Sequence, residues 1–162
     1  MSIKKSILIE LERETRNTGR ILERITDEHL DWRPHEKSRS LGELAAHIVE
    51  LHNWVSKALS KDVFDFNTDY QPLKINAIEE LKGILAKGLI ANQEMIEQLP
   101  EEYWLKEWVL KAGDYEMARM PKVGAVRYII TNHLIHHRGQ LTVYLRLLNI
   151  PVPGLYGPSA DE

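Results

Sequence analysis

Three histidines have the spacing and the surroundings expected of metal ligands. His133 and His137 are four residues apart, which places both imidazoles on one face of a helix, one turn from each other. The same face carries aliphatic side chains, among which a polar ring nitrogen is costly unless it has a partner. Neutral imidazole is a good ligand for zinc, nickel or iron(II), so one divalent metal would satisfy both rings. His47 lies at the edge of a second apolar stripe and is the natural third ligand.

Three protein nitrogens would leave at least one coordination position open, which distinguishes catalytic from closed structural metal sites. Two alternatives stay open at this point. His136 is three residues from His133 and competes with His137 for the helical pair, although it lies further round the helix and is expected at a solvated edge. The three histidines could also form a hydrogen-bonded core cluster that holds no metal.

The other histidines are expected to have no chemical role. His52 follows His47 by five residues and so faces about 140° away on a helix, which favours a surface position. His29 and His35 fall in the first connection between helices. No residue outside the three candidate ligands stands out as a general base, so the sequence assigns no catalytic residue.

Two acidic residues flank His47 at helical spacing. Glu43 and Glu50 could each accept a hydrogen bond from the second ring nitrogen of a ligand, which would fix the orientation of that ring. The simpler interpretations, a helix cap for Glu43 and a solvated face for Glu50, are favoured. Gly139 lies in mid-helix just after the histidine pair, and a glycine there is expected where a neighbouring helix approaches closely.

Four segments with a 3.6-residue apolar period are predicted to carry these residues. Ser40 and Glu43 have the S-x-x-E spacing of a capping box, which marks the start of the second segment. Pro121 suits the first turn of the fourth segment. The predicted helices cover about residues 3–26, 41–59, 76–99 and 121–148.

Three stretches connect or follow these helices. Residues 60–75 are polar and are predicted as a loop, whereas 106–119 favour a short hairpin. Residues 149–162 are rich in proline and glycine and are predicted to form a non-helical tail. The predicted fold class is therefore all-α, a four-helix bundle that forms a single domain over residues 1–162.

The composition excludes several classes of function. The 162-residue chain has no cysteine and therefore no disulfide, no thiolate zinc site and no cysteine nucleophile. Its formal net charge of -3 disfavours nucleic acid as a partner, because such binding needs a strongly positive surface. No apolar run approaches the length that crosses a bilayer, so we expect no membrane association and a cytoplasmic location.

Four stretches of the sequence together resemble one protein family over nearly the whole chain. The most specific feature of this resemblance is an inward histidine on the second predicted helix combined with H-x-x-x-H-R-G-Q on the fourth. In these stretches the chain is similar to the DinB/YfiT-like superfamily of bacterial metal-dependent enzymes. They are residues 31–34 (DWRP), 40–48 (SLGELAAHI), 133–141 (HLIHHRGQL) and 150–159 (IPVPGLYGPS).

The resemblance implies a four-helix bundle of up-down-down-up order that binds one divalent metal, often zinc or nickel. Its ligands would be the three histidines already singled out, His47, His133 and His137. The resemblance also implies a homodimer and a small-molecule substrate such as a low-molecular-weight thiol. The expected function is that of a metal-dependent S-transferase or hydrolase. The alternative is a non-catalytic metal-binding or stress-response protein with the same bundle.

Overall fold

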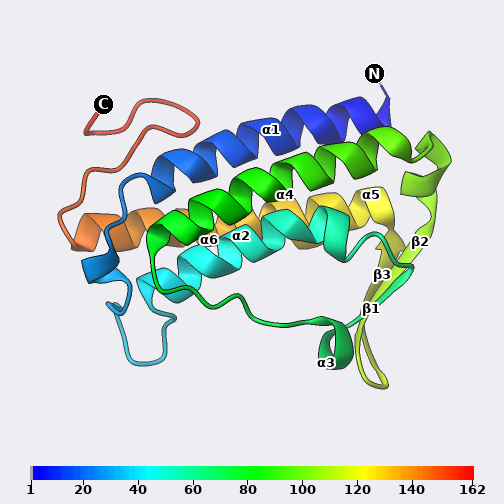
Figure 1. Cartoon of the computed structure of the whole chain (residues 1–162), viewed down its shortest axis with the longest axis horizontal. Coiled ribbons are helices and arrows are strands. Elements are labelled where there is room, and N and C mark those ends of the chain that lie inside the picture. Colours follow the sequence, from blue (N-terminus) through cyan, green and yellow to red (C-terminus); the bar gives the residue numbers. More distant parts are fainter. Residues whose placement is uncertain (1) are drawn as a thin grey trace.

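The computed structural model describes residues 2–162, and helices make up most of the fold (Figure 1). α1 and α6 run in one direction, whereas α2 and α4 run in the opposite direction (Figure 1). α2 packs against both α4 and α6, and α4 also packs against α1. The long helices are α1 (Ile3–Leu22), α2 (Leu41–Lys57), α4 (Ile78–Gln98) and α6 (Asn132–Leu147).

Short elements join the long helices. Asp27–His29 (η1) and Glu101–Leu105 (η2) are single 3₁₀ turns, and α3 (Phe66–Asp69) is one helical turn within the predicted loop. α5 (Lys122–Ala125) and a π-helical segment, η3 (Val126–Thr131), lead directly into α6. The single helix predicted over 121–148 is thus divided into three parts, although it lies where the apolar period placed it.

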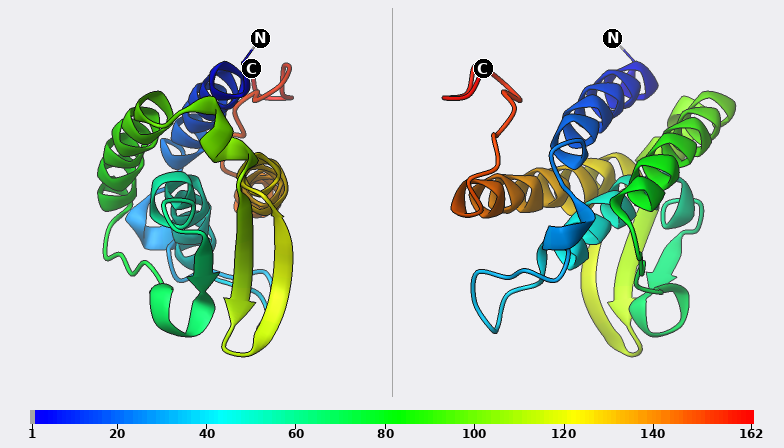
Figure 2. Two further views of the ribbon diagram at one scale, coloured as in Figure 1. Left: turned by 90° about the vertical axis from the view of Figure 1, so that its right-hand side faces the viewer. Right: turned by 60° about the vertical axis from the view of Figure 1, so that its left-hand side comes forward.

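A small sheet lies at one end of the helices (Figure 2). Its strand order is β1-β2-β3, with β1 (Val63–Asp65) parallel to β2 (Glu107–Ala112) and β2 antiparallel to β3 (Tyr115–Pro121). Gly113 makes the turn between β2 and β3 at a φ of 61°, a backbone conformation that glycine adopts without strain. The predicted hairpin is confirmed, but the all-α class is corrected to a mostly helical fold with a three-stranded sheet.

The start of α2 is fixed by a complete capping box. The hydroxyl of Ser40 accepts a hydrogen bond from the backbone N–H of Glu43 (3.2 Å), and the Glu43 carboxylate accepts one from the backbone N–H of Ser40 (2.7 Å). Gly42 donates its N–H to the carbonyl of Leu30 at 2.9 Å, and a Cβ at Gly42 would lie 3.0 Å from that oxygen. These contacts set the position of the helix within two turns before His47.

α2 is the central helix, and most of its circumference is buried. His52 is 1 % exposed, so the expectation that it lies on the surface is wrong. The helix has neighbours on several sides, because α1, α4, η3 and α6 all contact it. An angular separation of about 140° from His47 therefore leads to another buried face rather than to solvent.

The tail after α6 is non-helical, as predicted, and is held by hydrogen bonds to a buried ion pair and by more exposed ion pairs of its own. The guanidinium of Arg138 is 1 % exposed and pairs with the carboxylate of Glu14 on α1. The same guanidinium donates a hydrogen bond to the hydroxyl of Tyr156 in the tail. Nearer the end of the chain, Arg146 pairs with Asp161 at 2.7 Å. None of the helices within residues 2–162 combines the length and apolar character that a membrane-crossing segment needs.

Candidate metal centre

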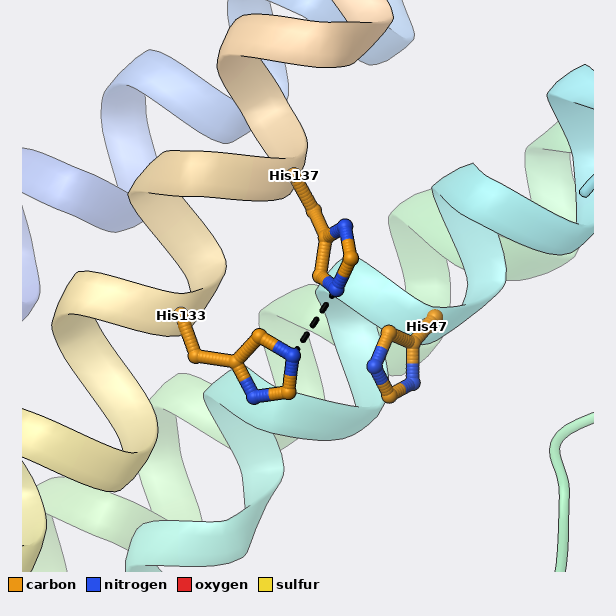
Figure 3. Close-up of side chains that lie close together, drawn as sticks. All are labelled: His47, His133 and His137. Atoms are coloured by element: carbon orange, nitrogen blue, oxygen red, sulfur yellow. Dashed lines mark hydrogen bonds between the residues drawn. The ribbon is translucent and has the colours of Figure 1, made fainter. Parts of the chain in front are cut away.

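The structure brings the three predicted ligands together. His47 on α2 faces His133 and His137 on α6, as Figure 3 shows. One potential ligand atom from each residue lies within 4.8 Å of the other two. The ring centroid of His47 is 5.3 Å from that of His133 and 4.9 Å from that of His137. This convergence of side chains from two helices was the main structural expectation from the sequence.

The π-helical segment contributes to this convergence. η3 ends at Thr131, and His133 lies in the first turn of α6. A π turn contains more residues than an α turn, so it rotates the face that the following helix presents. The rotation after η3 sets the face on which His133 and His137 meet His47. π-Helical turns often occur at functional sites, which agrees with this position.

Two of the three rings have one nitrogen engaged outside the cluster. The Nδ1 of His47 lies 2.9 Å from the Oε2 of Glu50, and the Nδ1 of His137 lies 2.7 Å from the Oε1 of Gln140. A partner on the second nitrogen fixes both the tautomer and the orientation of a metal-ligating imidazole. These contacts turn the other nitrogen of His47 and of His137 toward the centre.

The Nε2 atoms of His133 and His137 are 2.8 Å apart, an ordinary hydrogen-bond distance, and Figure 3 marks this contact as a hydrogen bond. One ring donates and the other accepts, so the pair must give up this bond when both nitrogens ligate a metal. Burial, followed by the nearby His137 and His47, lowers the pKa of His133 to about 4. Burial likewise lowers the pKa of His137.

Glu50 is a buried carboxylate that supports His47, so the interpretation of Glu50 as a solvated face is wrong. It also accepts hydrogen bonds from the hydroxyl of Tyr70 (3.0 Å) and from the backbone N–H of Leu73. Burial alone would raise the pKa of Glu50, but the hydrogen bonds from His47, Leu73 and Tyr70 outweigh it and hold the pKa below its usual value. An ionised Glu50 is a strong acceptor for the N–H of His47.

Of the remaining expectations about residues near the site, the structure confirms most and contradicts one. Glu43 caps α2, as favoured, and His136 is exposed at the edge of the cluster. His29 and His35 lie outside the three-histidine group. The interpretation of Gly139 is wrong, since a Cβ built there would meet nothing within 4 Å.

Sequence reasoning missed Gln140 and Tyr70. The signal for Gln140 was available, because it follows His137 by three residues just as Glu50 follows His47. Tyr70 approaches Glu50 from the segment between α3 and α4, and no local pattern indicates that contact.

A cavity of about 360 Å³ opens beside His47, between α2 and the segment that precedes α4. This volume is at the lower end of the range for sites that bind small molecules. The cavity is lined by Arg39, Glu43, His47, Glu50, Tyr70, Pro72 and Leu73.

The donor set fits a divalent transition metal. Tetrahedral zinc at about 2.0–2.1 Å from each imidazole nitrogen separates those nitrogens by roughly 3.4 Å. Ligand atoms that lie within 4.8 Å of one another reach this spacing after small ring rotations. Three imidazoles also match the nitrogen preference of zinc and nickel. The group could therefore hold a metal ion.

A mostly helical fold with a small sheet and a three-histidine group defines the class of this protein. The chain belongs to the DinB family, whose model matches residues 1–162. It is 25 % identical over 154 residues to the uncharacterized protein YrdA of Bacillus subtilis (strain 168), covering 93 % of this chain and 86 % of that protein. It is 28 % identical over 130 residues to the uncharacterized protein YjoA of the same organism, covering 80 % of each chain.

Two crystal structures of DinB-like proteins share the fold. One, from Bacillus cereus ATCC 10987, superposes with a TM-score of 0.73 at 25 % identity and covers 94 % of this chain and 97 % of the other. The other is YjoA of Bacillus subtilis, with a TM-score of 0.71 at 21 % identity, covering 95 % of this chain and 99 % of that chain.

Proposed function

We propose that this protein is a metal-dependent enzyme whose single divalent ion, zinc or nickel, is bound by His47, His133 and His137. The observation that carries the proposal is the convergence of three imidazoles, two of which have hydrogen-bond partners on their outer nitrogens. A cation between the rings would replace the hydrogen bond between the Nε2 atoms of His133 and His137 and give the inner nitrogen of each of the three rings a partner. A bound metal of this kind supplies Lewis acidity, which lowers the pKa of a thiol or water toward neutrality.

The cavity supports an enzyme more than a non-catalytic metal protein. A structural site is closed by protein ligands, whereas here space for a small molecule adjoins His47. In this proposal Glu50 and Gln140 hold the ligating rings in place, and the cavity receives a small molecule such as a low-molecular-weight thiol. The reaction is S-transfer or hydrolysis.

Further parts of the proposal come from the sequence and from the family resemblance. The opposed directions of α1 and α6 against α2 and α4 agree with a four-helix bundle of up-down-down-up order (Figure 1). We also propose a single-domain protein that forms a homodimer, resides in the cytoplasm and binds neither nucleic acid nor membranes. Light scattering of the purified protein would test the dimer directly.

Elemental analysis of the purified protein tests metal binding. We expect about one equivalent of zinc or nickel per chain, and we expect its loss in His133→Ala and in His137→Ala. His136→Ala is the matched control, since it removes an exposed imidazole from the same helix and should retain the metal. Circular dichroism establishes that each variant is folded. Folded wild-type protein that takes up neither metal when supplied with it would refute the proposal.

Catalysis is tested separately from binding. The loaded protein should transfer or hydrolyse groups on small thiol-containing molecules, and this activity should disappear with the metal in both histidine variants. A protein that binds one equivalent of metal but shows no turnover with any such substrate would instead be the non-catalytic metal-binding protein.

A further inference from the structure

Arg39 is a cation at the mouth of the metal-centre cavity that no acidic side chain neutralises. It lines the same cavity as His47 and Tyr70. Among the ion pairs formed by residues 2–162, none involves Arg39. An arginine beside a ligand cavity without an internal partner has its guanidinium donors available for a bound molecule.

The two acidic residues of the cavity are both engaged elsewhere. Glu50 accepts hydrogen bonds from His47, Tyr70 and Leu73. Glu43 accepts the N–H of Ser40 in the capping box, and its carboxylate lies 3.7 Å from Arg33 rather than from Arg39. Neither carboxylate forms an ion pair with Arg39, whose exposed side chain lines the cavity.

The backbone at Arg39 is held on both sides, although its side chain is free. Its carbonyl accepts a hydrogen bond from the hydroxyl of Tyr144 on α6 at 3.3 Å. The next residue, Ser40, is the N-cap of α2, and Leu41 donates its N–H to the carbonyl of Trp32 at 2.8 Å. Both helices that carry the three histidines thus fix the base of this side chain, which lowers the entropy lost when it binds a ligand.

We propose that Arg39 binds the carboxylate of the small molecule whose other end reaches the three-histidine centre. A guanidinium presents two parallel N–H groups that match a carboxylate, and such pairs combine charge with fixed geometry. Glu43, on the same cavity wall, favours a singly charged group over a more highly charged one such as phosphate. The inference rests on the proposed function, because it gives the substrate class of the same site: a small thiol that carries a carboxylate.

The test compares charged and neutral thiols on the cobalt-loaded protein. Co(II) is a spectroscopic substitute for zinc, and a bound thiolate adds a charge-transfer absorption that reports binding without any turnover. Titration with mercaptoacetate, mercaptopropionate and mercaptobutyrate covers three separations between sulfur and carboxylate. Mercaptoethanol, mercaptopropanol and mercaptobutanol are the neutral counterparts. Arg39→Gln removes the charge, and Lys37→Gln is the matched control, since Lys37 is an exposed cation in the same connection that does not line the cavity.

We expect Arg39→Gln to weaken the best mercaptocarboxylate by about fivefold or more, as for a charge-assisted pair at a solvent-accessible site. The same change should leave the mercaptoalcohols within about twofold, and Lys37→Gln should leave both series unchanged. Arg39→Lys should restore part of the affinity, because it keeps the charge without the two-pronged geometry.

The outcomes separate the two proposals. If the folded protein binds neither Co(II) nor zinc or nickel, the proposed function is wrong and this inference fails with it. If Co(II) and thiols bind but Arg39→Gln affects both series equally or neither, the metal centre stands and the role assigned to Arg39 is wrong. If Lys37→Gln also weakens the binding of the mercaptocarboxylates selectively, the effect belongs to the general charge of the connection and the inference is refuted.

Discussion

The hydrogen bonds of Glu50 predict how strongly it supports the metal centre. One carboxylate oxygen serves both His47 (2.9 Å) and Tyr70 (3.0 Å), and the other accepts the backbone N–H of Leu73. Glu50→Gln keeps the size of the side chain but replaces one oxygen by an NH₂ group. That group must face either the Leu73 N–H or the two donors on the other side, so at least one donor loses its acceptor.

The expected consequence is a loss of metal affinity of about 10- to 100-fold, which is the usual cost of removing the partner of a ligating histidine. This corresponds to about 1.4 to 2.8 kcal/mol of binding free energy. Competition with a chromophoric zinc chelator at pH 7 measures the dissociation constant. Glu43→Gln is the control: this residue belongs to the capping box of α2, in which a glutamine carbonyl can also accept the Ser40 N–H, and it has no hydrogen bond to a histidine, so metal affinity should not change.

Two results would refute this reasoning. If Glu50→Gln binds zinc as tightly as the wild type while remaining folded, the contact with His47 does not orient a ligand. If Glu43→Gln loses as much affinity as Glu50→Gln, the effect reflects the stability of α2 rather than the imidazole of His47.

Three predictions concern stability. Burial lowers the pKa of His52 below 6.5, so in acid the unfolded chain binds a proton that the folded state excludes. Urea denaturation should therefore show that the free energy of unfolding falls as the pH drops below about 6.5. This dependence on pH should be weaker in His52→Gln. A Cβ at Gly88 would lie 1.7 Å from the Oδ1 of Asn53, so Gly88→Ala should destabilise the protein by about 1–3 kcal/mol. A Cβ at Gly83 would meet no atom within 4 Å, so Gly83→Ala should stabilise the protein by up to about 1 kcal/mol. Arg138→Met should cost about 3–5 kcal/mol, because it leaves a buried carboxylate unpaired, and should make the tail a faster target in limited proteolysis.

Features set by neighbours in sequence were predictable. The capping box of Ser40 and Glu43 forms as its spacing indicated, and the helical pair His133 and His137 faces inward because four residues make about one turn. The hairpin in 106–119 followed from a turn between two short extended pieces. In each case the residues that determine the structure lie within a few positions of one another.

Features set by distant parts of the chain were not predictable in this way. β1 pairs in parallel with β2 through partners such as Val63 and Val109, and a parallel pair has no connecting turn that a sequence could reveal. Tyr70 meets Glu50 only because the segment before α4 crosses over α2. The apolar residues of η3 are of the same kind as those of an α-helix, so the apolar period of the sequence predicted one continuous helix.

The contrast between His47 and His52 shows which property identifies a candidate ligand. Both are buried on α2, at 7 % and 1 % exposure, so burial does not separate them. His52 has a partner on each nitrogen, with Nε2 at 2.8 Å from the hydroxyl of Thr15 and Nδ1 at 2.8 Å from the Oδ1 of Asn53. His47 has a protein partner on Nδ1 alone, and its remaining nitrogen belongs to a group with two other imidazoles and an adjoining cavity. Because a buried polar atom needs a partner, it is this unmet requirement, and not the presence of a core histidine, that argues for a metal.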